Sequence, residues 1–128
     1  MKSTQILCFN TLIITCLVIS RELSEAERDP DLMKKKADDF YKQGNFLAAA
    51  NAYTQAIRLR PNFPSYYSNR AACHLQVNNL MKCVEDSSKA LELLTPPVDS
   101  NAKERLLAHI RRGTALAKLE LVVGNFFY

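Results

Sequence analysis

The sequence predicts an all-α fold built as a stack of antiparallel helix pairs, and two observations carry this prediction. Similar residues recur at an offset of 34 positions, as in Ala37 and Ala71, Ala56 and Ala90, and Phe46 and Leu80. A fixed period of this length is typical of units that bury their apolar face only by stacking on a neighbour. The composition agrees, because 3 glycines and no tryptophan in 128 residues do not suit a turn-rich β fold.

Local signals set the limits of the first helix pair. Asp29 can cap a helix that begins at Pro30, so we predict a helix over residues 30–43 that ends before Gly44. The second helix is predicted over residues 46–59 and is stopped by Pro61, which has no amide donor.

The second pair follows the same plan. Pro64 begins a predicted helix over residues 64–76, Asn78 and Asn79 form the turn, and the next helix covers residues 80–94. Together these four helices make two complete units.

A third unit starts late and is incomplete. After Pro96, Pro97 and a loop to about Ser100, a fifth helix is predicted over residues 102–121, followed by a short apolar tail. Gly113 is then in register with Ala71, although the two lie 42 residues apart instead of 34. The predicted architecture is therefore two full repeats plus the first helix of a third.

Small and large apolar residues alternate where the helices must cross. This spacing is what ridge-into-groove packing requires, so both sets are predicted to form the core. The small residues are Ala37, Ala49, Ala56, Ala71, Cys83, Ala90 and Gly113. The large residues are Phe40, Phe46, Tyr53, Tyr67 and Leu80.

The N-terminal residues have a different character. Lys2 precedes an apolar run over residues 6–19, which is short for a membrane span and is typical of a signal-peptide core, with Val18 and Ser20 before a cleavage site. The alternative is a leader from a different first exon, without function. We divide the chain into an apolar leader (1–20), an acidic linker (21–29), the repeat domain (30–123) and a tail (124–128).

Several classes of function are not supported by any motif. The cysteines show no C-x-x-C spacing, and Cys73 and Cys83 fall on apolar helix positions, so we predict core thiols. His74 and His109 lie in different repeats without a partner at ligand spacing, which predicts no metal. We expect no cofactor, no enzyme activity and, with a net charge of only +4 and no broad basic stripe, no nucleic-acid binding.

This constellation resembles the tetratricopeptide repeat (TPR) family. The first unit matches its pattern at Ala37, Phe40, Phe46, Ala49, Tyr53, Ala56 and Pro61. The second unit matches at Tyr67, Ala71, Leu80 and Ala90. Residues 68–75, 85–94 and 109–115 are similar to the repeat region of the axonemal dynein assembly factors in particular, in which case this chain would be a truncated form.

The resemblance also implies a binding site. In chaperone-binding members, basic and amide side chains form a carboxylate clamp for the C-terminal tails of 70- and 90-kDa heat-shock chaperones. Lys34, Asn69 and Arg111 match three of its positions. Asp38 and Leu107 depart from the other two, and Asp38 would repel a carboxylate, so weak binding is expected.

As a function, the resemblance implies an adaptor or co-chaperone in the cytoplasmic preassembly of axonemal dynein arms for ciliary motility. It also implies roles in neuronal migration and oestrogen-receptor binding, with further locations in the nucleus and neuron projections. Dynein subunits and other assembly factors would be partners. Two alternatives stay open: a secreted or membrane-tethered helical protein directed by the leader, and a non-functional truncated isoform.

Overall fold

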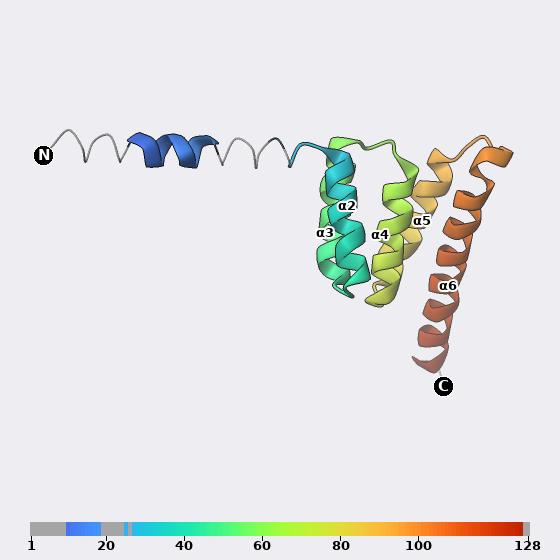
Figure 1. The fold of residues 1–128 in the computed structure, drawn as a ribbon. Helices are drawn as coiled ribbons and strands as arrows, with labels where there is room; N and C mark the ends of the chain where they lie inside the picture. Colours follow the sequence, from blue (N-terminus) through green and yellow to red (C-terminus); the bar gives the residue numbers. More distant parts are fainter. Residues whose placement is uncertain (1–9, 19–24, 26, 127–128) are drawn as a thin grey trace, which may run out of the picture.

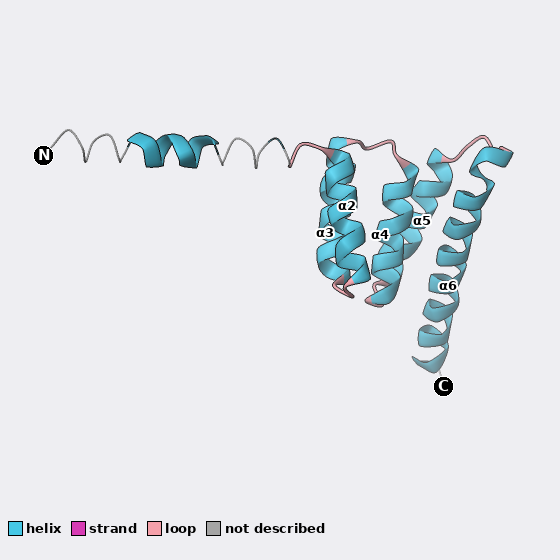
Figure 2. Cartoon of the chain, in the orientation of Figure 1, coloured by secondary structure: helices cyan, strands magenta, loops and turns pink. Residues whose placement is uncertain are grey.

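The structure is a computed structural model that describes residues 10–18, 25 and 27–126. Its repeat region runs α2 (Pro30–Lys42), α3 (Phe46–Leu59), α4 (Pro64–Gln76), α5 (Leu80–Leu93), a 3-10 turn η1 (Asp99–Asn101) and α6 (Ala102–Phe126). Each helix packs against the next along the chain, and α6 also contacts α4 (Figure 1). All regular structure in the described residues is helical, as Figure 2 shows, so the predicted fold class is confirmed.

The predicted signals do set the helix limits. Asp29 caps α2 by accepting a hydrogen bond from the amide of Asp31 at 3.0 Å, and Gly44 ends the helix with a φ of 79°. Such a φ favours glycine, because residues with a side chain rarely adopt this left-handed backbone conformation. Asn78, with a φ of 57°, makes the corresponding turn between α4 and α5.

The predicted end of the last helix is wrong. The prediction stopped at Leu121 with a short apolar tail, whereas α6 continues to Phe126. Gly124 did not end the helix, and a glycine inside a helix costs only about 1 kcal/mol relative to alanine.

Small residues fill the helix crossings largely as predicted. Six of the seven are fully buried: Ala37, Ala49, Ala56, Ala71, Cys83 and Ala90. Gly113 is the exception and lies exposed, because α6 packs on α4 and α5 through Ala108 and Ala115 instead. The tyrosine assignment also changes, since Tyr66 is fully buried and the predicted core residue Tyr67 is only half-buried.

A buried polar cluster joins α3, α4 and α5. Arg70 binds Asp86 through two parallel hydrogen bonds of 2.7 Å and donates a third, of 3.0 Å, to Thr54. His74 Nε2 lies 3.6 Å from the same carboxylate. Asp86 is therefore the interhelical partner of Arg70. His74, for which the sequence indicated no partner at ligand spacing, also lies beside this carboxylate.

Part of the leader is helical and unpacked. Residues 10–18 form a short helix in which Leu12, Ile13, Ile14 and Leu17 are all at least half exposed. Lys2, Cys8 and Ser20 lie outside the described residues, as do most of the linker and the last two residues. Within the described ranges, no helix combines the length and apolar character needed to cross a membrane.

Candidate peptide-binding groove

A groove of about 250 Å³ opens between α2, α3, α4 and α6. It is lined by Asp38, Tyr41, Lys42, Tyr53, Asn69, Ala72 and Arg111. Three of the five clamp positions, Asp38, Asn69 and Arg111, therefore line the same groove, although they lie on three different helices. The stacking of helix pairs brings them together, because α2, α4 and α6 are the first helices of successive units.

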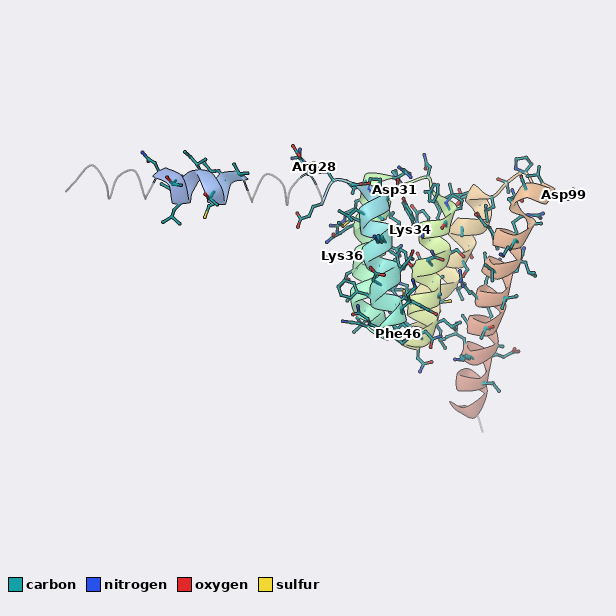
Figure 3. All side chains as sticks on the ribbon, viewed as in Figure 1. Arg28, Asp31, Lys34, Lys36, Phe46 and Asp99 are labelled. Carbon is teal, nitrogen blue, oxygen red and sulfur yellow. The ribbon has the colours of Figure 1, made fainter. Side chains whose placement is uncertain are left out.

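Lys34 and Asp38 are engaged with each other. They lie one turn apart on α2, and Lys34 Nζ donates to Asp38 Oδ2 at 2.7 Å with both side chains about one-third exposed. Pairs at this spacing face each other on a helix surface. Figure 3 labels Lys34 on the side of α2 nearer α4, whereas the exposed Lys36 lies on the opposite side. The positive charge of Lys34, which matches the clamp, is thus partly neutralised by Asp38, which departs from it.

Tyr53 holds the other oxygen of Asp38. Its hydroxyl donates to Asp38 Oδ1, so the carboxylate bridges α2 and α3. Burial, and then the neighbouring Asp38, raise the pKa of Tyr53 above its ordinary value, while a hydrogen bond with Asn69 acts in the opposite direction. The phenol therefore stays protonated and remains a donor to Asp38.

Arg111 reaches the groove from α6 and is anchored on α4. Its Nη1 donates to the carbonyl oxygen of Ser68 at 2.8 Å and to the Ser68 hydroxyl at 2.5 Å. These bonds use one guanidinium nitrogen and leave donors on the other two for a ligand. Leu107, one turn earlier on α6, is 40% exposed and offers only an apolar contact.

The arrangement suits an acidic ligand of small size. Lys34, Lys42 and Arg111 bring three positive charges to the groove or its edge, against one carboxylate from Asp38. Arginine and amide donors bind carboxylates by charge-assisted hydrogen bonds of roughly 1.5–3 kcal/mol each. Asp38 already accepts hydrogen bonds from Lys34 and Tyr53, so a carboxylate in this groove would meet a like charge and would compete for the same donors.

Four residues that form or support this groove were not predicted from the sequence. Tyr53 was assigned to the core alone, and neither Tyr41 nor Lys42 was singled out. Ser68, which positions Arg111, was also missed. The pairing of Lys34 with Asp38 could have been predicted from their spacing of four residues, but the contacts from α3 and α6 have no local signal.

Metal-ligating side chains do not cluster in the described residues, and the two cysteines of the repeat region are buried. No group of three or more His, Cys, Asp or Glu side chains comes together in residues 10–18, 25 and 27–126. Cys16, Cys73 and Cys83 are free, and burial raises the pKa of Cys73 to about 11. Because the thiolate is the reactive form, Cys73 is a packing residue at neutral pH.

Helix pairs stacked at a period of 34 residues around such a groove define a class of protein-interaction module. The sequence profile described as TPR repeat matches residues 37–78. The N-terminal domain of stress-induced protein-1 (STI-1) from C. elegans superposes with a TM-score of 0.64 and 30% identity, covering 74% of this chain and 75% of that one. The chain belongs to the tetratricopeptide repeat family.

Two curated relatives narrow the comparison. Dynein axonemal assembly factor 4 from Mus musculus is 57% identical over 102 residues, which cover 80% of this chain and 24% of that protein. Hsp70-Hsp90 organizing protein 2 from Arabidopsis thaliana is 33% identical over 87 residues, covering 57% of this chain and 15% of that protein. The chain thus spans about a quarter of the assembly factor that it matches.

Proposed function

We propose that the chain is an adaptor whose groove binds the acidic C-terminal tail of a heat-shock chaperone, and binds it weakly. One observation carries the proposal: Asn69 from α4 and Arg111 from α6 line the same 250 Å³ groove beside the Lys34–Asp38 pair of α2. A chain terminus that ends in aspartate presents two carboxylates, and donors from separate helices can meet both. Similarity to a protein named for organizing Hsp70 and Hsp90 supports this ligand class.

The same proposal gives the adaptor a cellular task. Identity of 57% to dynein axonemal assembly factor 4 supports a role in the preassembly of axonemal dynein arms in the cytoplasm, with dynein subunits or other assembly factors as clients. In this scheme the groove holds the chaperone, and other surfaces of the stack contact the client.

Asp38 sets the strength of binding. A peptide carboxylate that enters the groove has to displace the Asp38 carboxylate from Lys34, because both oxygens of Asp38 are already engaged by Lys34 and Tyr53. Replacing Asp38 with asparagine removes the like charge and releases Lys34, while the amide oxygen can still accept from Tyr53. We therefore expect Asp38→Asn to bind the peptide at least about tenfold more tightly, equivalent to about 1.4 kcal/mol.

The test is a calorimetric titration with a peptide that ends in Glu-Glu-Val-Asp. Asp39→Asn is the matched control, since Asp39 is the exposed neighbour on α2, changes the net charge equally and does not line the groove. We expect its affinity to stay within about threefold of the wild type. A peptide amidated at its C-terminus should bind more weakly to every variant. If it binds as well as the free acid, or if neither Asp38→Asn nor the wild type binds at millimolar peptide, the proposal is wrong.

An alternative function rests on the leader. Residues 10–18 expose Leu12, Ile14 and Leu17 along a short helix that lies away from the repeat stack (Figure 1), which favours a targeting role in a secreted or membrane-tethered protein. Fusing residues 1–25 to a reporter separates the two proposals. Secretion or membrane retention of the reporter would support the alternative, whereas a diffuse cytoplasmic signal would support the adaptor.

A further inference from the structure

The groove contains a cation that does not belong to the five clamp positions. Lys42, the last residue of α2, lines it together with Asn69 and Arg111. The side chain of Lys42 is exposed, and no hydrogen bond or ion pair engages it within the described part of the chain. The residues that line the groove do not include Lys34, the lysine that matches the family pattern. The two lysines of α2 therefore differ both in position and in availability to a ligand.

Lys34 and Lys42 lie on either side of Asp38 along α2. Each is four residues from Asp38, so the three side chains share one face of the helix, and the lysines are separated by about 12 Å along its axis. Lys34 donates to one oxygen of Asp38 at 2.7 Å, and Tyr53 donates to the other. The carboxylate is thus held from the Lys34 side and from α3, which leaves the charge of Lys42 uncompensated.

Helix geometry directs Lys42 back along the groove. Side chains of an α-helix point towards its N-terminus, so the long side chain of Lys42 extends over the turn that begins at Asp38. Its ammonium group has three donors on a flexible stem. Arg111 faces the same groove from α6 with donors that its bonds to Ser68 do not use. In a groove of about 250 Å³, cations from two helices can approach one carboxylate together.

We propose that Lys42, together with Arg111, binds one of the two carboxylates of the acidic tail. The inference rests on the proposed function and names the residue of α2 that first engages the ligand. A carboxylate beside Lys42 breaks no ion pair of the chain, whereas one that binds Lys34 has to separate it from Asp38. The other carboxylate of the tail is then the one that meets Asp38, so binding stays weak even with Lys42 engaged.

NMR titration of the full chain with the Glu-Glu-Val-Asp peptide tests the role of Lys42. Lys42→Met removes the charge but keeps an unbranched side chain, and it should weaken binding at least about tenfold. Lys42→Arg keeps the charge and should bind within about threefold of the wild type. The matched control is Lys36→Met, which removes the same charge from an exposed position on the other side of α2 (Figure 3) and should also stay within about threefold.

Two altered peptides show whether Lys42 contacts the ligand or only adds to the positive field. One peptide is amidated at its C-terminus and the other ends in asparagine, so each has lost one of the two carboxylates. Both should bind the wild type more weakly than the unmodified peptide. In Lys42→Met one of them should lose no further affinity, because its missing carboxylate was the partner of Lys42. If both losses persist unchanged in Lys42→Met, the lysine acts only through its field and the inference is wrong.

A second probe distinguishes this inference from the proposed function. N-acetyl-aspartate carries both carboxylates of a terminal aspartate without the rest of the peptide, and it should shift the NMR signals of the Lys42 side chain but not those of Lys36. If it does so while the tail peptide fails to bind, the proposed function is wrong and the carboxylate site stands. If the tail peptide binds the wild type and Lys42→Met equally well, this inference alone is wrong. A chain that binds neither probe overturns both.

Discussion

The interhelical ion pair of Arg70 with Asp86 is predicted to be the most sensitive polar contact of the stack. Its side chains are only 19% and 9% exposed, and the two bonds of 2.7 Å have the bidentate geometry that guanidinium and carboxylate groups prefer. The hydrogen bond to Asp86 raises the pKa of Arg70 further, against the effect of burial. Arg70 is therefore charged at neutral pH, and its guanidinium group and the Asp86 carboxylate depend on each other for hydrogen bonds.

Replacing only Arg70 or only Asp86 should lower the free energy of unfolding far more than replacing both residues. Arg70→Met leaves the Asp86 carboxylate buried without a cation, and losses of about 3–5 kcal/mol are typical of such broken pairs. Asp86→Leu strands the guanidinium similarly, although its 19% exposure and its bond to Thr54 should reduce the loss to about 2–3 kcal/mol. The double variant carries no stranded charge, so we expect its stability within about 1 kcal/mol of the wild type.

Urea denaturation followed by circular dichroism measures these differences. With a slope of roughly 1–2 kcal/mol per molar urea, a loss of 3 kcal/mol lowers the midpoint by about 1.5–3 M. Lys89→Met is the control, because Lys89 and its partner Glu92 are 43% and 69% exposed and such pairs contribute at most about 1 kcal/mol. The reasoning would be refuted if Arg70→Met cost no more than Lys89→Met, or if the double variant lost the sum of the two single losses.

Two other predictions concern pH and backbone conformation. Burial lowers the pKa of His74 below 6.5, so on acidification the unfolded chain takes up a proton before the folded one does. The free energy of unfolding should therefore fall as pH drops from about 7.5 through 6.5, and His74→Gln should flatten this dependence in urea titrations, whereas the same change at the exposed His109 should not. Gly44→Ala should destabilise the fold by about 1 kcal/mol because Gly44 has a φ of 79°, while Gly113→Ala, inside a helix with free space, should stabilise the fold by up to about 1 kcal/mol. Thermal melting checks both, and equal shifts of the same sign would contradict the explanation.

Much of the fold could be predicted because its signals are local. Pro30 and Pro64 begin helices, Gly44 ends one and Asn78 makes a turn through backbone properties that each residue carries by itself. The 34-residue period then repeats these signals at equal intervals. Where the local signal was weak, as at Gly124, the predicted end of the helix was wrong by five residues.

Only part of the candidate groove could be predicted from the sequence. Lys34, Asn69 and Arg111 could be chosen because the family pattern fixes their positions, and the structure places Asn69 and Arg111 at one hollow. Nothing in the chain order indicated that Tyr53, fifteen residues beyond Asp38, would hold that carboxylate. A hydrogen bond between helices depends on which faces they turn to each other, and periodicity alone leaves that choice among several residues.

The sequence by itself thus determined that this protein is a stack of TPR helix pairs, because turn chemistry and the spacing of small residues act over a few positions. Only the tertiary structure decided which polar groups meet. It paired Arg70 with Asp86 across 16 residues and anchored Arg111 on Ser68 across 43. It also left Gly113 on an open face, although its register predicted a buried crossing. Burial and charge pairing depend on which helix covers which face, and that is settled only when all the helices are packed together.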